Sequence, residues 1–222
     1  MTAAHSRGTD GRRTDRRQAI LEGAFTVFAR KGFDDTGVQE VAAEAGVAKP
    51  TVYNHFGDKA ALFRQALAAA NRAMLDARVA ALEPLATPGE DLPATLEAVA
   101  YELLLLHGDE RSCALRRLLF SEITRFPDAL DIVNEDGPHR LVRALADRLA
   151  RLALAGRLSA PDPDLAAEQL LALLTGPMEA RTRMGTRRLD DEELRAVART
   201  AVATFLSAYG TGGPGPHAAP HV

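Results

Sequence analysis

Two short helical patterns that lie only three residues apart constrain the fold of this chain most strongly. Over residues 37–45, four apolar residues recur at the spacing i, i+3, i+4 and i+7, which predicts an amphipathic helix of barely two turns. These residues are Val38, Val41, Ala42 and Ala45. Gly46 ends this helix, and a second short helix is predicted at about 49–55. Two short helices joined by a tight turn that contains glycine are typical of a helix-turn-helix.

The second short helix divides into a core side and an exposed side. At about 100° per residue, Val52 and Phe56 can face the core, whereas Pro50 and Asn54 lie on the opposite side. Pro50 is tolerated because it falls in the first turn, where its missing N–H has no partner to lose.

The polar residues around this helix suit double-stranded DNA. Hydroxyl and cationic groups can donate to phosphates, and the Asn54 amide can hydrogen-bond to a base edge. Lys59 opposes the dipole of the helix that follows, which makes sense if it holds a phosphate together with exposed N–H groups. The expected DNA contacts are Lys49, Pro50, Thr51, Tyr53, Asn54, His55 and Lys59. A solvated helix face, with Tyr53 and His55 in packing contacts, is the alternative that the same residues leave open.

Helical periodicity continues through the rest of the chain. Further helices are predicted at about 15–31, 59–82, 92–107, 111–126, 128–155, 163–183 and 190–208. Thr36 and Gln39 match the spacing of a capping box before the 37–45 helix, and Asp58 can cap the 59–82 helix. Aromatic residues make up only 5% of the chain and β-branched residues are few, which favours helices over strands. The predicted fold is all-α, with a three-helix head joined by the 59–82 helix to a helical body.

We expect four segments along the chain. They are a disordered basic arm (1–13), the helix-turn-helix domain (14–60), a ligand-binding and dimerisation domain (61–209) and a disordered tail rich in Gly and Pro (210–222). Residues 1–17 hold five arginines and two aspartates, although the whole chain of 222 residues has a net charge of −3. A basic N-terminus on a slightly acidic body is compatible with a small DNA-binding head.

Composition argues against several classes of protein. A hydrophobic content of 46% is too high for a disordered chain. Neither a signal peptide nor an apolar stretch long enough to span a bilayer is present, and Cys113 is the only cysteine, so we expect a cytoplasmic protein that makes no membrane contact. The six histidines show no metal-ligand spacing, and no catalytic motif is found, so we expect no metal, no cofactor and no enzymatic activity.

Residues 20–63 resemble the N-terminal domain of the tetracycline-repressor (TetR) family of transcriptional regulators. The patterns that carry the resemblance are F-x-x-x-G-F-x-x-T, A-x-x-A-G-V, T-V-Y-x-H-F and D-K-x-x-L-F, in this order. The resemblance implies an all-helical dimer whose first three helices bind DNA and whose variable body binds small molecules. It implies base or groove contacts for Lys49, Pro50, Thr51 and Asn54, and phosphate contacts for Thr36, Tyr53, His55 and Lys59.

Three positions depart from the pattern of the family. Ala48 stands where many members carry a serine that can cap the recognition helix. Gly37 replaces a base-contacting basic residue of some members, and Asn54 stands where an aromatic residue or arginine is common. The mode of docking follows from the resemblance, but the operator sequence does not.

The body resembles one effector-domain subgroup only over "LLFSEITRFPDALDIVNEDGP", around an E-x-x-R-F-P break. The candidate effector-binding residues are Tyr101, Leu104, Leu105, His107, Phe120, Ile123, Thr124, Met178 and Arg181. Each of these side chains could instead belong to an ordinary helical core or helix end. Small and branched residues in the last two helices favour close packing across a two-fold axis, as a four-helix bundle.

The predicted function is that of a homodimeric regulator, a repressor released from a pseudo-palindromic operator by a small lipophilic effector. Its two recognition helices, ~34 Å apart, would enter successive major grooves. The alternative is a DNA-binding regulator without an effector, controlled by a protein partner.

Overall fold

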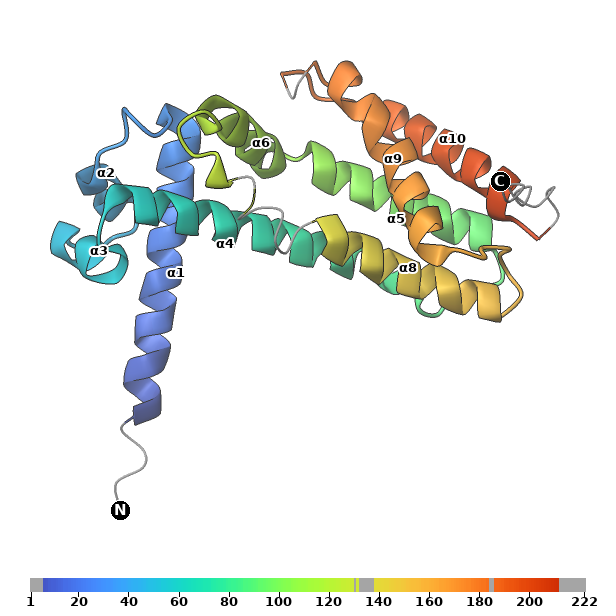
Figure 1. Cartoon of the computed structure of the whole chain (residues 1–222), viewed down its shortest axis with the longest axis horizontal. Helices are drawn as coiled ribbons and strands as arrows, with labels where there is room; N and C mark the ends of the chain where they lie inside the picture. The colour runs from blue at the N-terminus through green and yellow to red at the C-terminus, as the bar shows by residue number, and fades with distance from the viewer. Residues whose placement is uncertain (1–5, 130, 132–137, 184–185, 212–222) are drawn as a thin grey trace, which may run out of the picture. The chain divides into compact units, whose positions relative to one another are not determined.

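The computed structural model describes residues 6–129, 131, 138–183 and 186–211, apart from the side chains of 6–12, 138 and 179. Within these residues it contains nine α-helices and one short 3-10 helix, with a single isolated bridge between Leu158 and Gly210 (Figure 1). The prediction of an all-α fold is confirmed. None of the described helices is long and apolar enough to cross a membrane.

The helices fall close to the predicted positions. They are α1 (Ser6–Lys31), α2 (Val38–Glu44), α3 (Lys49–Phe56), α4 (Lys59–Ala80), η1 (Glu83–Leu85), α5 (Leu92–Gly108), α6 (Glu110–Glu122), α8 (Pro138–Leu154), α9 (Pro163–Arg181) and α10 (Asp191–Tyr209). The segment predicted at 128–155 is helical at 128, 129 and 131, and again in α8, which begins at Pro138, a residue well suited to a first helical position. Residues 130 and 132–137 lie outside the described part of the chain.

The chain divides into two compact units. The first consists of Met1–Ala73 and Ala114–Asp136, and the second of Met74–Cys113 and Gly137–Val222. The domain boundary expected at residue 60 separates the DNA-binding region from the ligand-binding and dimerisation region, whereas these two units are defined by packing. By packing, the first part of α4 and most of α6 belong with the three N-terminal helices.

A cluster of phenylalanines holds the first unit together. Phe63 of α4 is fully buried, and its ring lies 5.0 Å from Phe28, 5.2 Å from Phe33 and 4.8 Å from Phe126 between ring centroids. Glu122, at the end of α6, accepts a hydrogen bond from the backbone N–H of Phe33 at 3.0 Å. These contacts join segments that are distant in the sequence, so the turn after α1 is fixed from several sides.

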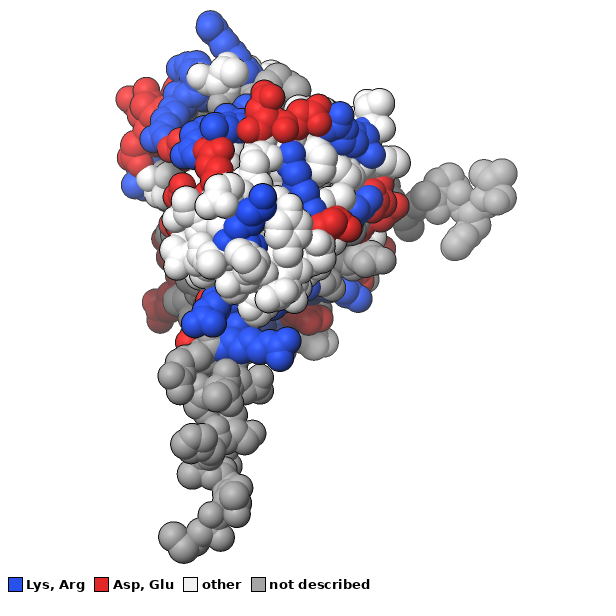
Figure 2. Space-filling model, turned by 90° about the vertical axis from the view of Figure 1, so that its left-hand side faces the viewer, with Lys and Arg blue, Asp and Glu red and all other residues white. Residues whose placement is uncertain are grey.

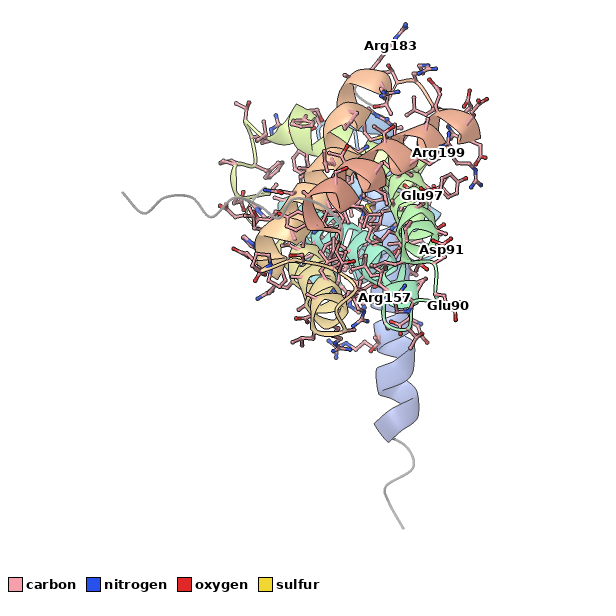
Figure 3. The ribbon with its side chains drawn as sticks, turned by 90° about the vertical axis from the view of Figure 1, so that its right-hand side faces the viewer. Glu90, Asp91, Glu97, Arg157, Arg183 and Arg199 are labelled. Carbon is pink, nitrogen blue, oxygen red and sulfur yellow. The ribbon has the colours of Figure 1, made fainter. Side chains whose placement is uncertain are left out.

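Leucine and alanine form most of the core of the second unit. The core lies between α5, α8, α9 and α10, with Leu104, Leu145 and Leu149 fully buried. The connection between η1 and α5 is held by Arg157, whose guanidinium donates to the carbonyls of Pro88, Gly89 and Glu90. Figure 3 shows Arg157 close to Glu90 on this side of the molecule.

The N-terminal segment differs from the prediction. The disordered arm expected at residues 1–13 is helical from Ser6, and residues 1–5 lie outside the described part of the chain. Adding a turn to an existing helix requires no new nucleation, so even a polar segment with two glycines can extend α1. Most of the tail predicted at 210–222 also lies outside the description, but Gly210 is placed, and its N–H donates to Leu206 O.

Candidate nucleic-acid interface

The turn between α2 and α3 depends on Gly46. Its φ of +64° lies in the left-handed region, which glycine adopts without the penalty of a Cβ atom. The N–H of Gly46 donates to Ala43 O at 3.2 Å, and that of Val47 donates to Ala42 O at 2.9 Å. These bonds satisfy carbonyl groups at the end of α2 and reverse the chain within three residues.

Helix α3 is anchored by two side chains and exposes the opposite face. Val52 and Phe56 are 2% and 5% exposed, so they fix the rotation of the helix about its axis. The predicted residues Lys49, Pro50, Tyr53 and Asn54 are exposed, and Thr51 and His55 are partly buried. Six of the residues expected to contact DNA therefore lie on one helix about 12 Å long, a size that the major groove admits.

Two of the exposed residues on α3 support each other. The Lys49 ammonium lies 5.8 Å from the centroid of the Tyr53 ring, within the range of a cation–π interaction. Tyr53 is 43% exposed, so its hydroxyl can still reach a ligand. The packing role that the sequence left open for His55 has some support, since its ring centroid lies 6.0 Å from that of Phe56.

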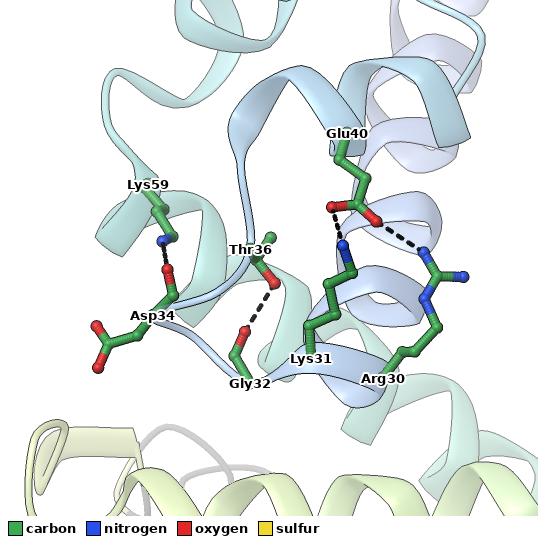
Figure 4. Close-up of polar contacts among 7 residues, drawn as sticks. All are labelled: Arg30, Lys31, Gly32, Asp34, Thr36, Glu40 and Lys59. Atoms are coloured by element: carbon green, nitrogen blue, oxygen red, sulfur yellow. Dashed lines mark hydrogen bonds and ion pairs between the residues drawn. The ribbon is translucent and has the colours of Figure 1, made fainter.

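Lys59 and Thr36 are both engaged within the protein (Figure 4). Lys59 Nζ donates to Asp34 O at 3.1 Å and lies 4.5 Å from the centroid of the Phe33 ring. An ammonium has three donors, so this contact orients Lys59 and leaves donors for a phosphate. Thr36 is only 3% exposed, and its hydroxyl donates to Gly32 O at 2.7 Å. A phosphate contact by Thr36 stays a prediction, and its burial gives it no support.

The predicted capping box of α2 is wrong. The N-cap residue is Gly37, which has no side chain to accept a hydrogen bond, because the Thr36 hydroxyl is directed back to the end of α1. The cap predicted for α4 is confirmed, since Asp58 Oδ1 accepts from Ala61 N at 2.7 Å. The cap position of α3 is Ala48, which makes no side-chain bond.

An ion-pair cluster fixes α2 against the end of α1. Glu40 accepts from Lys31 Nζ at 2.9 Å and from Arg30 at 3.0 Å (Figure 4). The hydrogen bond from Lys31 foremost, and that from Arg30, hold the pKa of the Glu40 carboxyl below its ordinary value. Arg125 pairs with Asp34 and lowers the pKa of that carboxyl, chiefly through their hydrogen bond.

Arg17 is a residue near the interface that the sequence pattern did not single out. Its guanidinium lies 5.4 Å from the centroid of the Phe56 ring at the end of α3, and it donates to Gln65 of α4 at 2.5 Å. The basic composition of residues 1–17 indicated a charged segment, but the contact depends on tertiary packing and could not be derived from spacing.

The second unit contains two cavities that include predicted effector-binding residues. A hollow of about 510 Å³ includes Leu104, Leu105 and Met178, beside Thr182 and Arg187. A smaller space of about 50 Å³ includes Leu104 and His107, with Arg78, Leu171 and Thr175 among the other residues that line it.

The other predicted effector-binding residues line neither cavity. The Tyr101 hydroxyl donates to Asp191, and the Arg195 guanidinium lies 4.1 Å from its ring centroid. Arg181 is exposed. Phe120, Ile123 and Thr124 belong to the first unit, where Phe120 is 58% exposed. Their roles in effector binding stay predictions. Among the described residues, no group of three or more His, Cys, Asp or Glu side chains could hold a metal ion.

Two family models match this chain. Residues 20–66 match the model "Bacterial regulatory proteins, tetR family", and residues 94–211 match "AefR-like transcriptional repressor, C-terminal domain". A helix-turn-helix head followed by an all-helical body of this type defines a DNA-binding transcriptional regulator. The chain belongs to the TetR family of bacterial regulatory proteins.

Solved structures and curated relatives agree with this assignment. A TetR-family transcriptional regulator from Mesorhizobium loti MAFF303099 is 30% identical, with a TM-score of 0.83 over 90% of this chain and 98% of that one. The flavonoid-responsive regulator FrrA is 26% identical, with a TM-score of 0.68 over 92% and 100% of the two chains. The transcriptional repressor KstR2 of Rhodococcus jostii (strain RHA1) is 34% identical over 92 residues, 41% of each protein. The matched part thus spans about two fifths of the length of KstR2.

Proposed function

We propose that this protein is a repressor that binds a pseudo-palindromic operator as a homodimer and leaves it when a small lipophilic effector binds. One observation carries the proposal. Helix α3 holds Lys49, Pro50, Tyr53 and Asn54 exposed together while Val52 and Phe56 anchor it. Such a helix can enter a major groove as a rigid body, so its base-side groups reach the bases in a fixed register. A regulator of bacterial genes would act in the cytoplasm.

The base-side and phosphate-side roles follow from the chemistry of each side chain. Asn54 can form two hydrogen bonds to an adenine edge, and Lys49 can donate to guanine acceptors. Pro50 and the methyl group of Thr51 can lie against thymine methyl groups. Tyr53, His55 and Lys59 can donate to phosphates, which orient the protein without reading the sequence.

The outer surface of α9 and α10 supports the proposed dimer. A shallow hollow of about 390 Å³ lies on these two helices, and most of its lining is small or apolar. Its residues are Gln169, Ala172, Leu173, Thr204, Phe205, Ala208 and Tyr209. Small side chains let helices approach closely, so a second copy could pack here as a four-helix bundle across a two-fold axis.

The hollow of about 510 Å³ supports the proposed effector site. Its volume lies within the usual range for small-molecule sites, about 300–1,000 Å³. Leu104, Leu105 and Met178 offer an apolar wall, and Met178 is a flexible side chain that can adapt to a ligand. An effector that prefers one separation of the recognition helices would shift the population away from the DNA-bound state.

The DNA-binding part is tested by selecting bound duplexes from a random pool. We expect an inverted repeat whose half-sites lie about one helical turn apart, or a multiple of it. Asn54→Ala should relax the preference at one position of each half-site by about 1–3 kcal/mol. Thr26→Ala, an exposed residue of α1 whose hydroxyl bonds within its own helix, is the matched control and should select the parent sequence. Selection of no common sequence by the parent protein would refute operator recognition.

The effector part is tested by a thermal-shift screen of lipophilic compounds. A ligand at about 100 times its dissociation constant should stabilise the protein by about 2.7 kcal/mol. Leu105→Trp should fill the hollow from its rim and abolish the shift, whereas Leu154→Trp, at a 90% exposed position of α8, should retain it. A compound that raises the melting temperature must also release the protein from its DNA. A screen without such a compound would favour control by a protein partner.

A further inference from the structure

The buried stripe of α1 changes its chemistry where it passes beyond the core of the first unit. Ile20, Leu21 and Ala24 are buried on this stripe. One to two turns earlier, at spacings of three and four residues, the same stripe is occupied by Arg17, Arg16 and Arg13. A core-facing side of the helix thus continues as a row of arginines, which we call the arginine stripe (Arg13, Arg16 and Arg17).

The acidic residues between positions 13 and 24 of α1 lie on the other side of the helix. At about 100° per residue, the arginine stripe falls within the same arc of about 140° as Ile20, Leu21 and Ala24. Asp15 and Glu22 lie close to the opposite direction. Over residues 13–24 of α1, the arginines therefore lie on the side of the core and the carboxylates lie away from it.

Arg17 shows which elements the arginine stripe adjoins. Its guanidinium lies over Phe56, the last residue of α3, at 5.4 Å, and donates to Gln65 of α4 at 2.5 Å. Arg13 and Arg16 are exposed, and Arg13 lies about 6 Å further along the helix axis than Arg17. Figure 2 shows Lys and Arg side chains gathered at the base of the described part of the molecule, next to the grey N-terminal residues.

We propose that the arginine stripe binds backbone phosphates of the DNA beside the groove that α3 enters. The proposal rests on the proposed function and widens its interface beyond the helix-turn-helix. A guanidinium can bind a phosphate through two parallel hydrogen bonds, and a row of exposed arginines that continues from the end of α3 complements one phosphate strand. Arg17 positions the stripe through Phe56, while Arg13 and Arg16 make the new contacts. These contacts raise affinity for every sequence and read none.

The experiment measures the salt dependence of DNA binding by the full chain. The probe is a fluorescein-labelled duplex of random sequence, titrated at several KCl concentrations by fluorescence anisotropy. The double variant Arg13→Ala/Arg16→Ala should lower the steepness of log K against log[KCl] by about 1.8 per bound subunit, since each phosphate contact contributes about 0.9. Arg13→Lys/Arg16→Lys should keep most of the steepness, because lysine retains the charge.

Arg151→Ala, an exposed arginine of α8 in the second unit, is the matched control and should leave the steepness unchanged. All variants should melt with the parent, because Arg13 and Arg16 are exposed. If the parent binds DNA with a salt-dependent affinity and the double alanine variant matches its steepness, the arginine stripe makes no phosphate contact and this inference is wrong. If the parent fails to bind any duplex, the proposed function itself falls, and the inference falls with it.

Discussion

The two units differ in the side chains that build their cores. Seven of the eight phenylalanines of the chain belong to the first unit, and Phe205 is the only one in the second. The first unit packs Phe28, Phe33, Phe63 and Phe126 ring against ring. The second unit is mainly leucine and alanine, and it contains the hollow of about 510 Å³ and the smaller space of about 50 Å³. Aromatic rings have few rotamers and preferred pair geometries, so they hold short helices in one arrangement.

The two units also differ in the residues that cap the starts of their helices. In the second unit the N-cap residues of α5, α9 and α10 are Asp91, Asp162 and Asp190, each of which accepts a backbone hydrogen bond from the first turn. In the first unit the N-cap residues of α2 and α3 are Gly37 and Ala48, which make no side-chain cap, whereas Asp58 caps α4. A carboxylate at the start of α3 would stand close to DNA phosphates and repel them. We therefore infer that α3 lacks a carboxylate cap in favour of DNA affinity, whereas α5, α9 and α10 carry one for stability.

The largest expected effect is on the aromatic cluster. Phe63→Ala should lower the free energy of unfolding by about 3–5 kcal/mol, because it removes a fully buried ring that touches three others. Phe63→Leu keeps more of the volume and should cost clearly less. Urea unfolding measures both variants. A loss below about 1 kcal/mol for Phe63→Ala would show that the cluster adapts as readily as a leucine core, and the contrast between the units would fail.

Much of this fold could be predicted from the sequence. Periodicity and the glycine and proline positions located all nine described helices, and "GVAKPTVYNHF" located the exposed and anchored sides of α3. These features are local, since they depend on spacing along one helix and on residues with special backbone freedom.

The sequence did not predict hydrogen bonds that side chains make to partners outside their own helix. Thr36 has the spacing of a capping box, yet its hydroxyl turns back to Gly32. Tyr101, whose role in effector binding stays a prediction, bonds to Asp191 of α10. Neither choice can be derived from spacing, because both depend on which helices meet and how they are rotated.

A smaller effect is expected at the turn that sets the angle of α3. Gly46→Ala should cost about 1–2 kcal/mol, since an L side chain at a φ of +64° is strained although the space around it is open. Gly46→Asn should recover part of the loss, because asparagine tolerates this conformation. Thermal unfolding compares the two variants, and DNA affinity should fall further in Gly46→Ala than in Gly46→Asn. Equal stability of the alanine variant and the parent would show that the turn adopts another conformation.

A single substitution at position 48 can give α3 the side-chain cap that it lacks. Ala48→Ser and Ala48→Asp should both stabilise the protein by about 1 kcal/mol, since either side chain can accept a hydrogen bond in the first turn of α3. DNA affinity should separate them. Ala48→Asp should bind the random duplex more weakly than Ala48→Ser, most clearly at low salt, because its carboxylate faces the phosphates. If the two variants bind DNA equally, the absence of a carboxylate at this cap has no electrostatic reason.

The smallest expected effect concerns the ion pairs that hold α2. Because Lys31 and Arg30 lower the pKa of Glu40 in the folded protein, the native state binds fewer protons than the unfolded state as the pH falls. The stabilisation is therefore complete above the unfolded pKa of about 4.3 and disappears as the pH falls through the folded value. At pH 6 the parent should unfold at a higher urea concentration than Glu40→Gln. This difference in urea midpoint should shrink as the pH is lowered to 3. The pair is exposed, so about 1 M NaCl should also reduce the gap. A gap that stays constant across this pH range would mean that the side chain acts through packing, and that charge contributes nothing to the placement of α2.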